Sequence, residues 1–315
     1  MARTENTVVA VVCGGTSAEA GVSRVSGRGV ADALGATYRS VVTIEYDNAV
    51  GDALREAKPD VVFPVLHGPP GEDGTFQGFL ETLGLPYVGS GVQASAFAMN
   101  KVVAKGLFAR AGLPMARDAV VRRDTAGPAA LDDVLMRLGP RLVVKPASQG
   151  SAVGVRFART AAELAAAVKA AFEFDDAVLV EERVEGREIT VAILERREVE
   201  ALPVVEVRTP EGTWYDFEHR YTQGLSEHVI PAPLPPAQYA RTQEVAREAH
   251  RALGCRDLSR VDFVVPASGE PILLEVNTIP GMTPTSLYPD AAKAAGIPFE
   301  RLVAHLVERA LDRAG

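Results

Sequence analysis

Three oxygen-bearing side chains stand on two short apolar segments near the C-terminal end of the sequence. Asp262 lies within RVDFVV, and Glu275 and Asn277 lie within LLEVN. Alternate residues of a strand share one face, so Glu275 and Asn277 point the same way and Asp262 can meet them from a neighbouring strand. Two carboxylates and an amide oxygen suit a hard cation, above all Mg²⁺ bridging nucleotide phosphates. The alternative, from this segment alone, is a charged pair on a solvated strand face.

A lysine and a glycine-rich loop form a second group. The segment VVKPASQGSAVG places Lys145 at the end of an apolar strand, directly before a flexible loop. The lysine and the backbone N–H groups of Gly150 and Ser151 can hold phosphate oxygens. The GxxxxGK[ST] pattern of a Walker A loop is absent. A tight hairpin without a ligand is an equally good interpretation of this loop taken alone.

Acidic residues and one histidine complete the set of candidate side chains. Glu181 and Glu188 bracket a turn at Gly186, where they could accept hydrogen bonds from an adenine amino group and ribose hydroxyls. A solvated charged turn is the alternative. His67 ends an apolar strand and precedes a glycine-rich loop, which is a suitable position for a site. The patterns GxGxxG, HExxH and GxSxG are absent, which argues against a dehydrogenase, a zinc protease and a serine hydrolase.

The elements that must position these residues alternate along the first third of the chain. Continuous apolar strands separated by helices predict a parallel α/β sheet, with ligands at the carboxyl ends of its strands. The predicted strands are residues 7–13, 39–44, 60–66, 141–145, 153–157, 177–181, 189–194, 202–207, 259–265 and 272–276. The predicted helices are residues 23–34, 51–57, 93–111, 161–172, 236–253 and 299–314.

Composition restricts the class of protein. The 315 residues are 47% apolar and 23% charged, which is enough for a packed core and excludes disordered and collagen-like classes. A net charge of −8 argues against nucleic acid as a partner and favours small molecules. Cys13 and Cys255 are far apart, which predicts no disulfide framework and no zinc set, and favours a reducing cytoplasm. The short apolar run near the N-terminus predicts a strand rather than a signal peptide or membrane span.

Seven segments, in this order, resemble the D-alanine–D-alanine ligases, which are ATP-grasp carboxylate–amine ligases. Each segment is moderately specific by itself, whereas the ordered set is highly specific. The resemblance extends from Val8 to about Val307. The segments are GGTSAEAGVS, LHGPPGEDGTFQG, PYVGSGVQASAFAMNK, VVKPASQGSAVGV, WYDFEHRYT, SRVDF and LLEVNTIPGMTPTSLYP.

The resemblance implies an ATP-grasp architecture of three α/β domains. These would be a substrate-facing N-terminal domain at residues 1–98, a central subdomain at 99–187, and a C-terminal subdomain with the metal and substrate site at 188–315. ATP would phosphorylate the first D-alanine, and the amine of the second would attack the acyl phosphate to give the dipeptide for peptidoglycan. The resemblance also implies Mg²⁺, with Mn²⁺ as an alternative, and a cytoplasmic homodimer.

The resemblance assigns nucleotide and metal roles residue by residue. Residues that would contact phosphates are Lys101, Lys145, Gly150, Ser151 and Arg220. Glu181 and the backbone of Val184 would hold adenine, and Glu188 would hold the ribose. The Mg²⁺ ligands would be Asp262, Glu275 and Asn277.

The resemblance assigns the substrate site in the same way. Glu19 would bind the ammonium of the first D-alanine, linked to Ser151 and Tyr221, with His67 nearby. Arg260 and the amide of Gly281 would stabilise the oxyanion of the tetrahedral intermediate. Ser286 and Leu287 would bind the second carboxylate at a helix N-terminus. Tyr221 favours an amine over a hydroxy-acid acceptor, and residues 209–224 are expected to be a lid that orders with nucleotide.

Four positions depart from the family's usual residues. Arg220 replaces a lysine, Asn100 an aspartate, Gln149 a glutamate and Gly21 a glutamate. These departures leave rate and substrate preference open. A relative that joins another D-amino or hydroxy acid and a non-catalytic nucleotide-binding relative therefore remain as alternatives.

Overall fold

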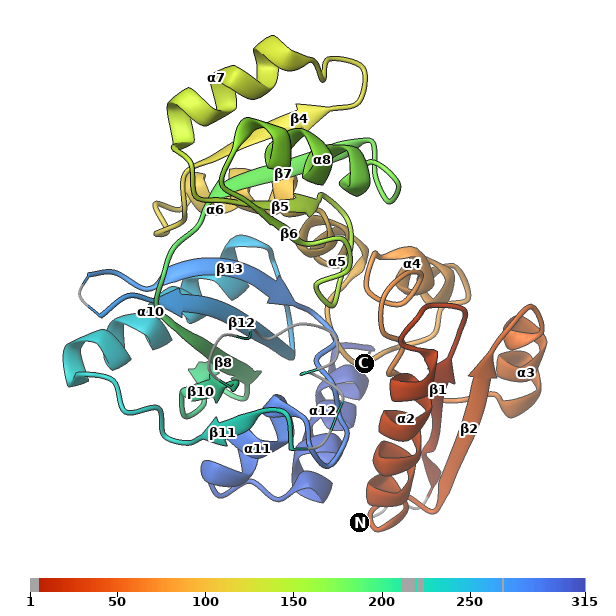
Figure 1. Cartoon of the computed structure of the whole chain (residues 1–315). Helices are drawn as coiled ribbons and strands as arrows, with labels where there is room; N and C mark the ends of the chain where they lie inside the picture. The colour runs from red at the N-terminus through yellow and green to blue at the C-terminus, as the bar shows by residue number, and fades with distance from the viewer. Residues whose placement is uncertain are drawn as a thin grey trace.

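The chain builds three separate sheets, each with helices packed against it (Figure 1). The computed structural model describes residues 6–210, 213, 219, 222, 224–267 and 269–314. Within these residues, no helix combines the length and the apolar character that crossing a membrane requires.

The N-terminal sheet is parallel, as the alternating pattern predicted. Its central strand β1 (Val8–Gly14) lies between β2 (Ser40–Tyr46) and β3 (Val61–Pro64). Val9 and Val11 pack with α2 (Ala20–Gly35) on one face. The alternate residues of β1 pack on the other face with α3 (Val50–Ala57) and α4 (Thr75–Thr82). Because both faces are covered, the strand is apolar throughout, and the predicted mixed α/β class with a parallel N-terminal sheet is confirmed.

A four-stranded antiparallel sheet follows, with the strand order β4-β7-β5-β6. Its strands are β4 (Asp118–Arg122), β5 (Leu142–Pro146), β6 (Arg156–Ala158) and β7 (Ala177–Glu182). The helices α7 (Pro128–Leu138) and α8 (Ala161–Ala171) pack their apolar sides onto it in one core. Strand β4 and helix α7 were missed by the sequence analysis, because residues 115–138 mix charged and apolar residues without a clear period.

The third sheet has six strands in the order β11-β10-β8-β12-β13, and β9 pairs with β8. The strands are β8 (Arg187–Glu195), β9 (Val199–Ala201), β10 (Val205–Arg208), β11 (Glu227–Val229), β12 (Leu258–Val265) and β13 (Ile272–Asn277). One core packs it against α10 (Pro236–Ala252), and another packs it against α11 (Leu287–Ala294) and α12 (Phe299–Ala314). The second of these cores also contains α2 and β1, so it joins this sheet to the N-terminal one.

The single helix predicted over residues 93–111 is wrong. The structure has two helices, α5 (Val92–Met99) and α6 (Lys101–Arg110), which are separated by Asn100 in an extended conformation. The Asn100 side chain accepts hydrogen bonds from the N–H groups of Val102 and Val103, both at 3.1 Å. This is an N-cap, a role in which Asn and Asp are about equally effective. The Asn100 departure therefore preserves the start of α6.

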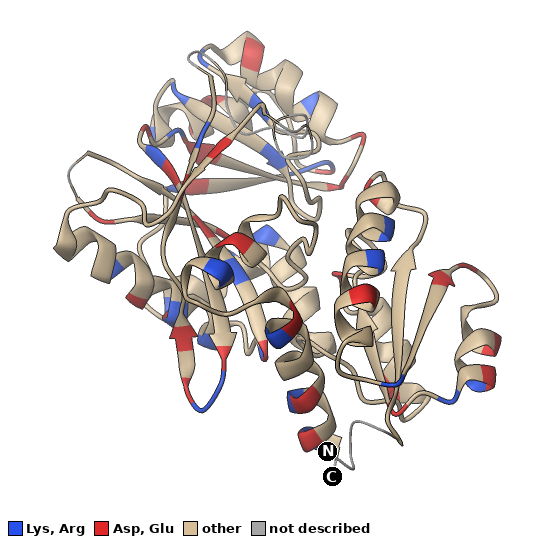
Figure 2. Cartoon of the chain, turned by 90° about the horizontal axis from the view of Figure 1, so that it is seen from below, with Lys and Arg blue, Asp and Glu red and all other residues tan. Residues whose placement is uncertain are grey.

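Charged residues of both signs are interspersed along the helices and loops in the view of Figure 2. In this view, the acidic residues that give the net charge of −8 are therefore spread over several elements rather than concentrated on one. The division into residues 1–98, 99–187 and 188–315 stays a prediction; α5 and α6 share their core with the six-stranded sheet.

Candidate active site

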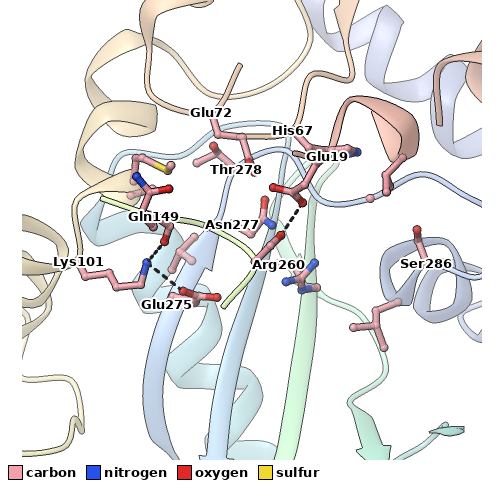
Figure 3. Close-up of a pocket in the computed structure, with 18 of the residues that line it drawn as sticks. Glu19, His67, Glu72, Lys101, Gln149, Arg260, Glu275, Asn277, Thr278 and Ser286 are labelled. Carbon is pink, nitrogen blue, oxygen red and sulfur yellow. Dashed lines mark hydrogen bonds and ion pairs between the residues drawn. The ribbon is translucent and has the colours of Figure 1, made fainter. Parts of the chain in front are cut away.

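Two neighbouring cavities lie among the three sheets, and Lys101, Gln149 and Glu275 line both of them. The first cavity, of about 870 Å³, lies between the six-stranded sheet, the start of α2 with the loop after β3, and the loop after β5 (Figure 3). The second cavity, of about 1370 Å³, lies between the four-stranded and six-stranded sheets. A ligand in one cavity can therefore meet a ligand in the other at their shared wall.

Nearly all of the described residues that the sequence predicted for a site line these cavities. The first cavity contains Glu19, His67, Lys101, Gly150, Ser151, Arg260, Glu275, Asn277, Gly281, Ser286 and Leu287. The second contains Lys101, Lys145, Glu181, Val184, Glu188 and Glu275. Asp262 is not part of either lining. Arg220, Tyr221 and most of the expected lid at 209–224 lie outside the described residues.

Glu19 and Ser151 connect two of the three sheets. Glu19 is the residue before α2, and its side chain is buried beside the first cavity. Ser151 lies in the loop between β5 and β6 and has a positive φ of 48°. Its hydroxyl donates a hydrogen bond of 2.5 Å to Oε1 of Glu19. The loop that follows β5, the strand that contains Lys145, is therefore held against the start of α2 in the N-terminal part of the protein.

His67 and Glu72 occupy the same side of the first cavity (Figure 3). Burial lowers the pKa of His67, which favours a neutral imidazole. The Glu72 carboxylate accepts a hydrogen bond of 2.6 Å from the N–H of Gly68. Burial, and next the charge of Glu19, raise the pKa of Glu72 to about 8. Glu72 was not among the predicted site residues, although it lies in the glycine-rich segment after His67.

Arg260 is fixed at the cavity wall by Asp262. Its Nε and Nη2 atoms lie 2.9 and 2.7 Å from the two carboxylate oxygens of Asp262. Thr190 of β8 donates a further hydrogen bond of 2.6 Å to Asp262 Oδ1. Such a two-point contact sets the plane of the guanidinium as well as its position. Asp262 therefore orients a cation that faces the first cavity.

Oxygen ligands for a hard cation are gathered on β12 and β13. The predicted neighbouring strands are paired, and their register places Asp262 opposite Glu275 and Arg260 opposite Asn277. Lys101 lies 3.6 Å from Glu275. The described residues contain no group of three His, Cys, Asp or Glu side chains arranged for a metal ion. Two carboxylates and one amide suit a cation that takes its remaining oxygens from phosphates and water, so the residues fit Mg²⁺.

A buried carboxylate between two lysines forms the wall of the second cavity. Oε2 of Glu181 lies 2.5 Å from Lys145 Nζ, and Oε1 lies 2.6 Å from Lys105 Nζ. Burial alone would raise the pKa of Glu181, but Lys145 and then Lys105 lower it to about 2. Burial alone would lower the pKa of Lys145, and Glu181 raises it overall. Lys105 was also missed, although it lies one helical turn after Lys101 on α6.

Ser286 and Leu287 lie at the beginning of α11, as predicted. Ser286 is the residue before the helix, and its Oγ accepts a hydrogen bond of 3.0 Å from the N–H of Thr283. A Cβ added to Gly281 would lie 2.8 Å from Ser286 Oγ, so glycine allows the two segments to approach. The first turn of α11 thus lies beside the backbone of Gly281 in the lining of the first cavity.

Comparison with known proteins identifies the family. A profile described as the D-ala D-ala ligase C-terminus matches residues 107–308, and one described as the N-terminus matches residues 47–90. The chain is 44% identical to the D-alanine–D-alanine ligase of Halalkalibacterium halodurans, over 97% of this chain and 99% of that protein.

Two solved structures have the same fold over nearly all of the chain. The D-alanine–D-alanine ligase of Bacillus anthracis complexed with ATP has a TM-score of 0.84 and 31% identity, covering 98% of both chains. The D-Ala:D-Ser ligase VanG of Enterococcus faecalis has a TM-score of 0.83 and 32% identity, covering 97% of this chain and 100% of that one. Because the family profiles, a relative that is 44% identical over nearly the whole chain and these structures all agree, the chain belongs to the D-alanine–D-alanine ligase family.

Proposed function

We propose that the protein ligates two D-alanines to D-alanyl-D-alanine for peptidoglycan synthesis, with ATP as co-substrate and an acyl phosphate as intermediate. The observation that carries this proposal is the shared wall of Lys101, Gln149 and Glu275 between the two cavities. A carboxylate in the first cavity and a phosphoryl group in the second would meet at this wall. Phosphoryl transfer depends on such positioning and on neutralisation of charge.

The second cavity would bind the nucleotide. Lys101, Lys145 and the backbone of Gly150 and Ser151 would contact phosphates. Glu181 and the backbone of Val184 would hold adenine, and Glu188 would hold the ribose. All of these except Gly150 and Ser151, which line the first cavity, line the second. Arg220 belongs to the proposal by family resemblance.

Asp262, Glu275 and Asn277 would hold Mg²⁺, with Mn²⁺ as an alternative. A bound cation would neutralise charge on the transferring phosphoryl group. Lys101, 3.6 Å from Glu275, would add positive charge at the same wall. The opposed positions of Asp262 and Glu275 on β12 and β13 support this assignment.

The first cavity would bind both amino acids. Glu19, with Ser151 and Tyr221, would fix the ammonium of the first D-alanine, and His67 would lie near it. Ser286 and Leu287 would bind the carboxylate of the second D-alanine. Arg260, held by Asp262, and the amide of Gly281 would stabilise the oxyanion that forms when the amine attacks. The Glu19–Ser151 hydrogen bond and the Arg260–Asp262 pair support these positions.

A cytoplasmic location and a homodimeric assembly are further parts of the proposal. The use of ATP and the two free, buried thiols of Cys13 and Cys255 support the first. The second rests on family resemblance, and sedimentation analysis of the purified protein tests it.

The decisive experiment is product identification by mass spectrometry. Purified protein is incubated with ATP, Mg²⁺ and D-alanine, and separately with D-alanine plus D-serine, D-lactate or L-alanine. We expect the D-alanyl-D-alanine dipeptide and one phosphate released per dipeptide, and no product without ATP. A mixed product in preference to the dipeptide would instead assign an acceptor such as that of the D-Ala:D-Ser relative. Nucleotide binding without phosphate release would identify a non-catalytic protein.

A further inference from the structure

Lys105 makes three polar contacts inside the protein. Its Nζ lies 2.6 Å from Glu181 Oε1 and 3.2 Å from Asp118 Oδ1, and it donates a hydrogen bond of 2.8 Å to the carbonyl oxygen of Ala116. An ammonium group has three N–H donors, and each of these acceptors can take one. The side chain is only 7% exposed, and it is not part of either cavity lining. Lys105 is therefore placed to act on a ligand through Glu181 rather than by direct contact.

Lys145 shares the same carboxylate but has different surroundings. Its Nζ lies 2.5 Å from Glu181 Oε2, its side chain is 14% exposed, and it lines the second cavity. Lys145 can therefore turn toward an anion in that cavity, whereas Lys105 is held by three acceptors, two from the start of β4 and one from β7. Of the two lysines paired with Glu181, Lys145 can therefore break its ion pair more easily than Lys105.

The carboxylate itself cannot be left without a partner. Glu181 is only 3% exposed, and an ionised carboxylate at such a position is costly unless a cation remains paired with it. When phosphates attract Lys145, Lys105 is the cation that can stay on Glu181. The carboxylate then remains ionised and keeps its position, with Oε2 released toward the cavity.

We propose that Lys105 is a positioning residue of the nucleotide site, which holds the Glu181 carboxylate in place while Lys145 exchanges that carboxylate for the phosphates of the nucleotide. This inference rests on the proposed nucleotide roles of Lys145 and Glu181 and adds a residue that acts on both. It has a specific consequence: loss of Lys105 should weaken binding more for a nucleotide with phosphates than for a nucleoside.

The test compares ADP with adenosine by calorimetric titration of wild type and Lys105→Met. With adenosine, Lys145 can stay on Glu181, so we expect a loss in affinity below about threefold. With ADP, Lys145 must leave a carboxylate that has no other cation, so we expect a loss of about ten- to a hundredfold. Lys169→Met, which removes an exposed lysine of α8, is the matched control and should change neither affinity.

A double variant separates positioning from a general structural effect. In Glu181→Gln the side chain carries no charge to be left unpaired. Adding Lys105→Met to that variant should therefore not change the ratio of ADP affinity to adenosine affinity. Equal losses for ADP and adenosine in Lys105→Met, or the same ADP-specific loss in the Glu181→Gln background, would overturn the proposal.

A measurement on the wild-type protein covers the case in which Lys105→Met does not fold. The chain has six lysines, so the side-chain NMR signals of protein labelled at lysine Cε and Nζ can be assigned by substitution. Saturation with ADP should shift the Lys145 signal and leave that of Lys105 nearly unchanged. An equal shift of both signals would contradict the exchange. If the proposed ligase activity failed but these nucleotide results held, the positioning role would stand without the reaction.

Discussion

At the scale of single residues, Glu275 occupies the wall that the two cavities share. Its carboxylate faces Lys101 and lies opposite Asp262. Glu275→Gln keeps the size of the side chain and removes the negative charge that would hold the proposed Mg²⁺ beside the transferring phosphoryl group. We expect dipeptide formation to fall at least about a hundredfold, measured as phosphate release with D-alanine. Because the Glu275 side chain is 30% exposed, the thermal unfolding temperature should change little.

The matched control for this prediction is Glu56→Gln, which neutralises an exposed carboxylate on α3. It should retain wild-type activity. Near-normal ligation by a folded Glu275→Gln protein would remove Glu275 from the metal site.

Glu72 gives the free energy of unfolding a dependence on pH. Its pKa is raised from 4.5 to about 8, first by burial and then by Glu19. Between these values the folded protein holds a proton that the unfolded chain has released. Because the unfolded state binds fewer protons, this group lowers the free energy of unfolding as the pH rises from about 4.5 to about 8. Glu72→Gln stays neutral and should remove this contribution.

Urea denaturation of both proteins at about pH 5 and about pH 8 measures the difference. Wild type should lose more stability than Glu72→Gln over this interval, while the contribution of His67 remains in both. Equal losses in the two proteins would show that Glu72 is ionised in the folded state.

At the scale of elements, α2, which begins directly after Glu19, must lie close against β1. A Cβ added to Gly27 would lie 2.5 Å from the Cβ of the buried Cys13, whereas a Cβ on Gly21 would meet no atom within 4 Å. Gly27→Ala should therefore destabilise the protein by about 1–3 kcal/mol through overpacking. Gly21→Ala, on the same helix, should stabilise it by about 0.5–1 kcal/mol.

Urea denaturation midpoints of these two variants provide the comparison, and each variant is the control for the other. Stabilisation by Gly27→Ala would mean that α2 can move away from β1 without loss. The family usually has a glutamate at position 21, so a stable Gly21→Ala protein would show that this chain also tolerates a side chain there.

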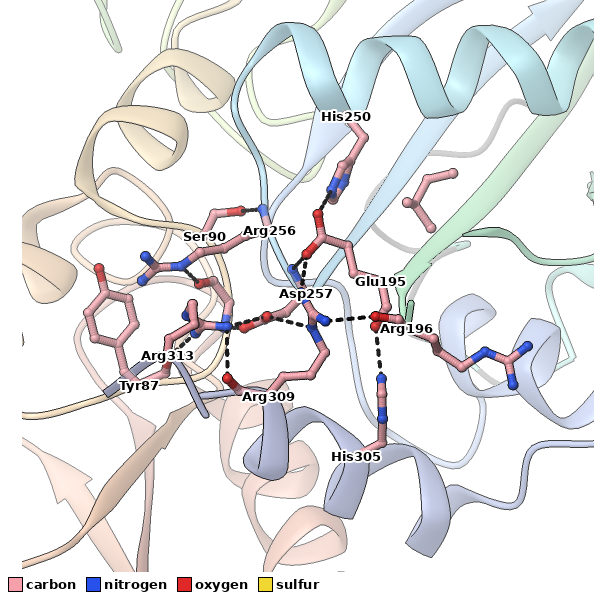
Figure 4. Close-up of polar contacts among 12 residues, drawn as sticks. Tyr87, Ser90, Glu195, Arg196, His250, Arg256, Asp257, His305, Arg309 and Arg313 are labelled. Atoms are coloured by element: carbon pink, nitrogen blue, oxygen red, sulfur yellow. Dashed lines mark hydrogen bonds and ion pairs between the residues drawn. The ribbon is translucent and has the colours of Figure 1, made fainter. Parts of the chain in front are cut away.

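At the scale of the whole molecule, a buried polar network joins the N-terminal sheet to α12 and β12 (Figure 4). Asp257 is fully buried and accepts a hydrogen bond of 2.8 Å from the N–H of Gly89. Arg309 lies 3.1 Å from Asp257 and 2.5 Å from Glu195, and Arg313 contacts Asp257 and the carbonyl oxygen of Tyr87. The network therefore fixes residues 87–90, which follow α4, against the start of β12, the strand that carries Arg260.

Asp257→Asn should weaken this junction. Asparagine tolerates the positive φ of 64° at this position, so the backbone is preserved while the charge is lost. The arginines left behind are partly exposed, and Arg309 keeps its contact with Glu195, so the substitution should cost about 1–3 kcal/mol in the free energy of unfolding. Hydrogen exchange should rise at residues 87–90 before it rises in the six-stranded core.

The control is Asp52→Asn. The side chain of Asp52 is 87% exposed, and its partner Arg55 on α3 is also exposed. Exposed pairs of this kind contribute at most about 1 kcal/mol. Similar effects of the two variants on stability would show that the Asp257 network does not hold the junction together.

The fold class, most of the strands and the family could be predicted from the order of the residues alone. The same pattern predicted that Asp262 would lie on the strand next to the one that carries Glu275 and Asn277, as the register shows. Alternate residues of a strand lie on the same face, so the face that each of these side chains occupies can be predicted from the local sequence alone. The ordered segments added expected roles for residues that no local pattern could assign.

The tertiary structure decided which side chains are partners. Asp262 holds Arg260, Glu181 is shared by Lys145 and Lys105, and Glu72 lies near Glu19. Lys105 and Glu181 are 76 positions apart in the sequence, and Asn100 divides a predicted helix by capping it. Periodicity describes which face of an element a residue occupies, but contact, burial and pKa depend on the elements packed against that face, and these come from distant parts of the chain.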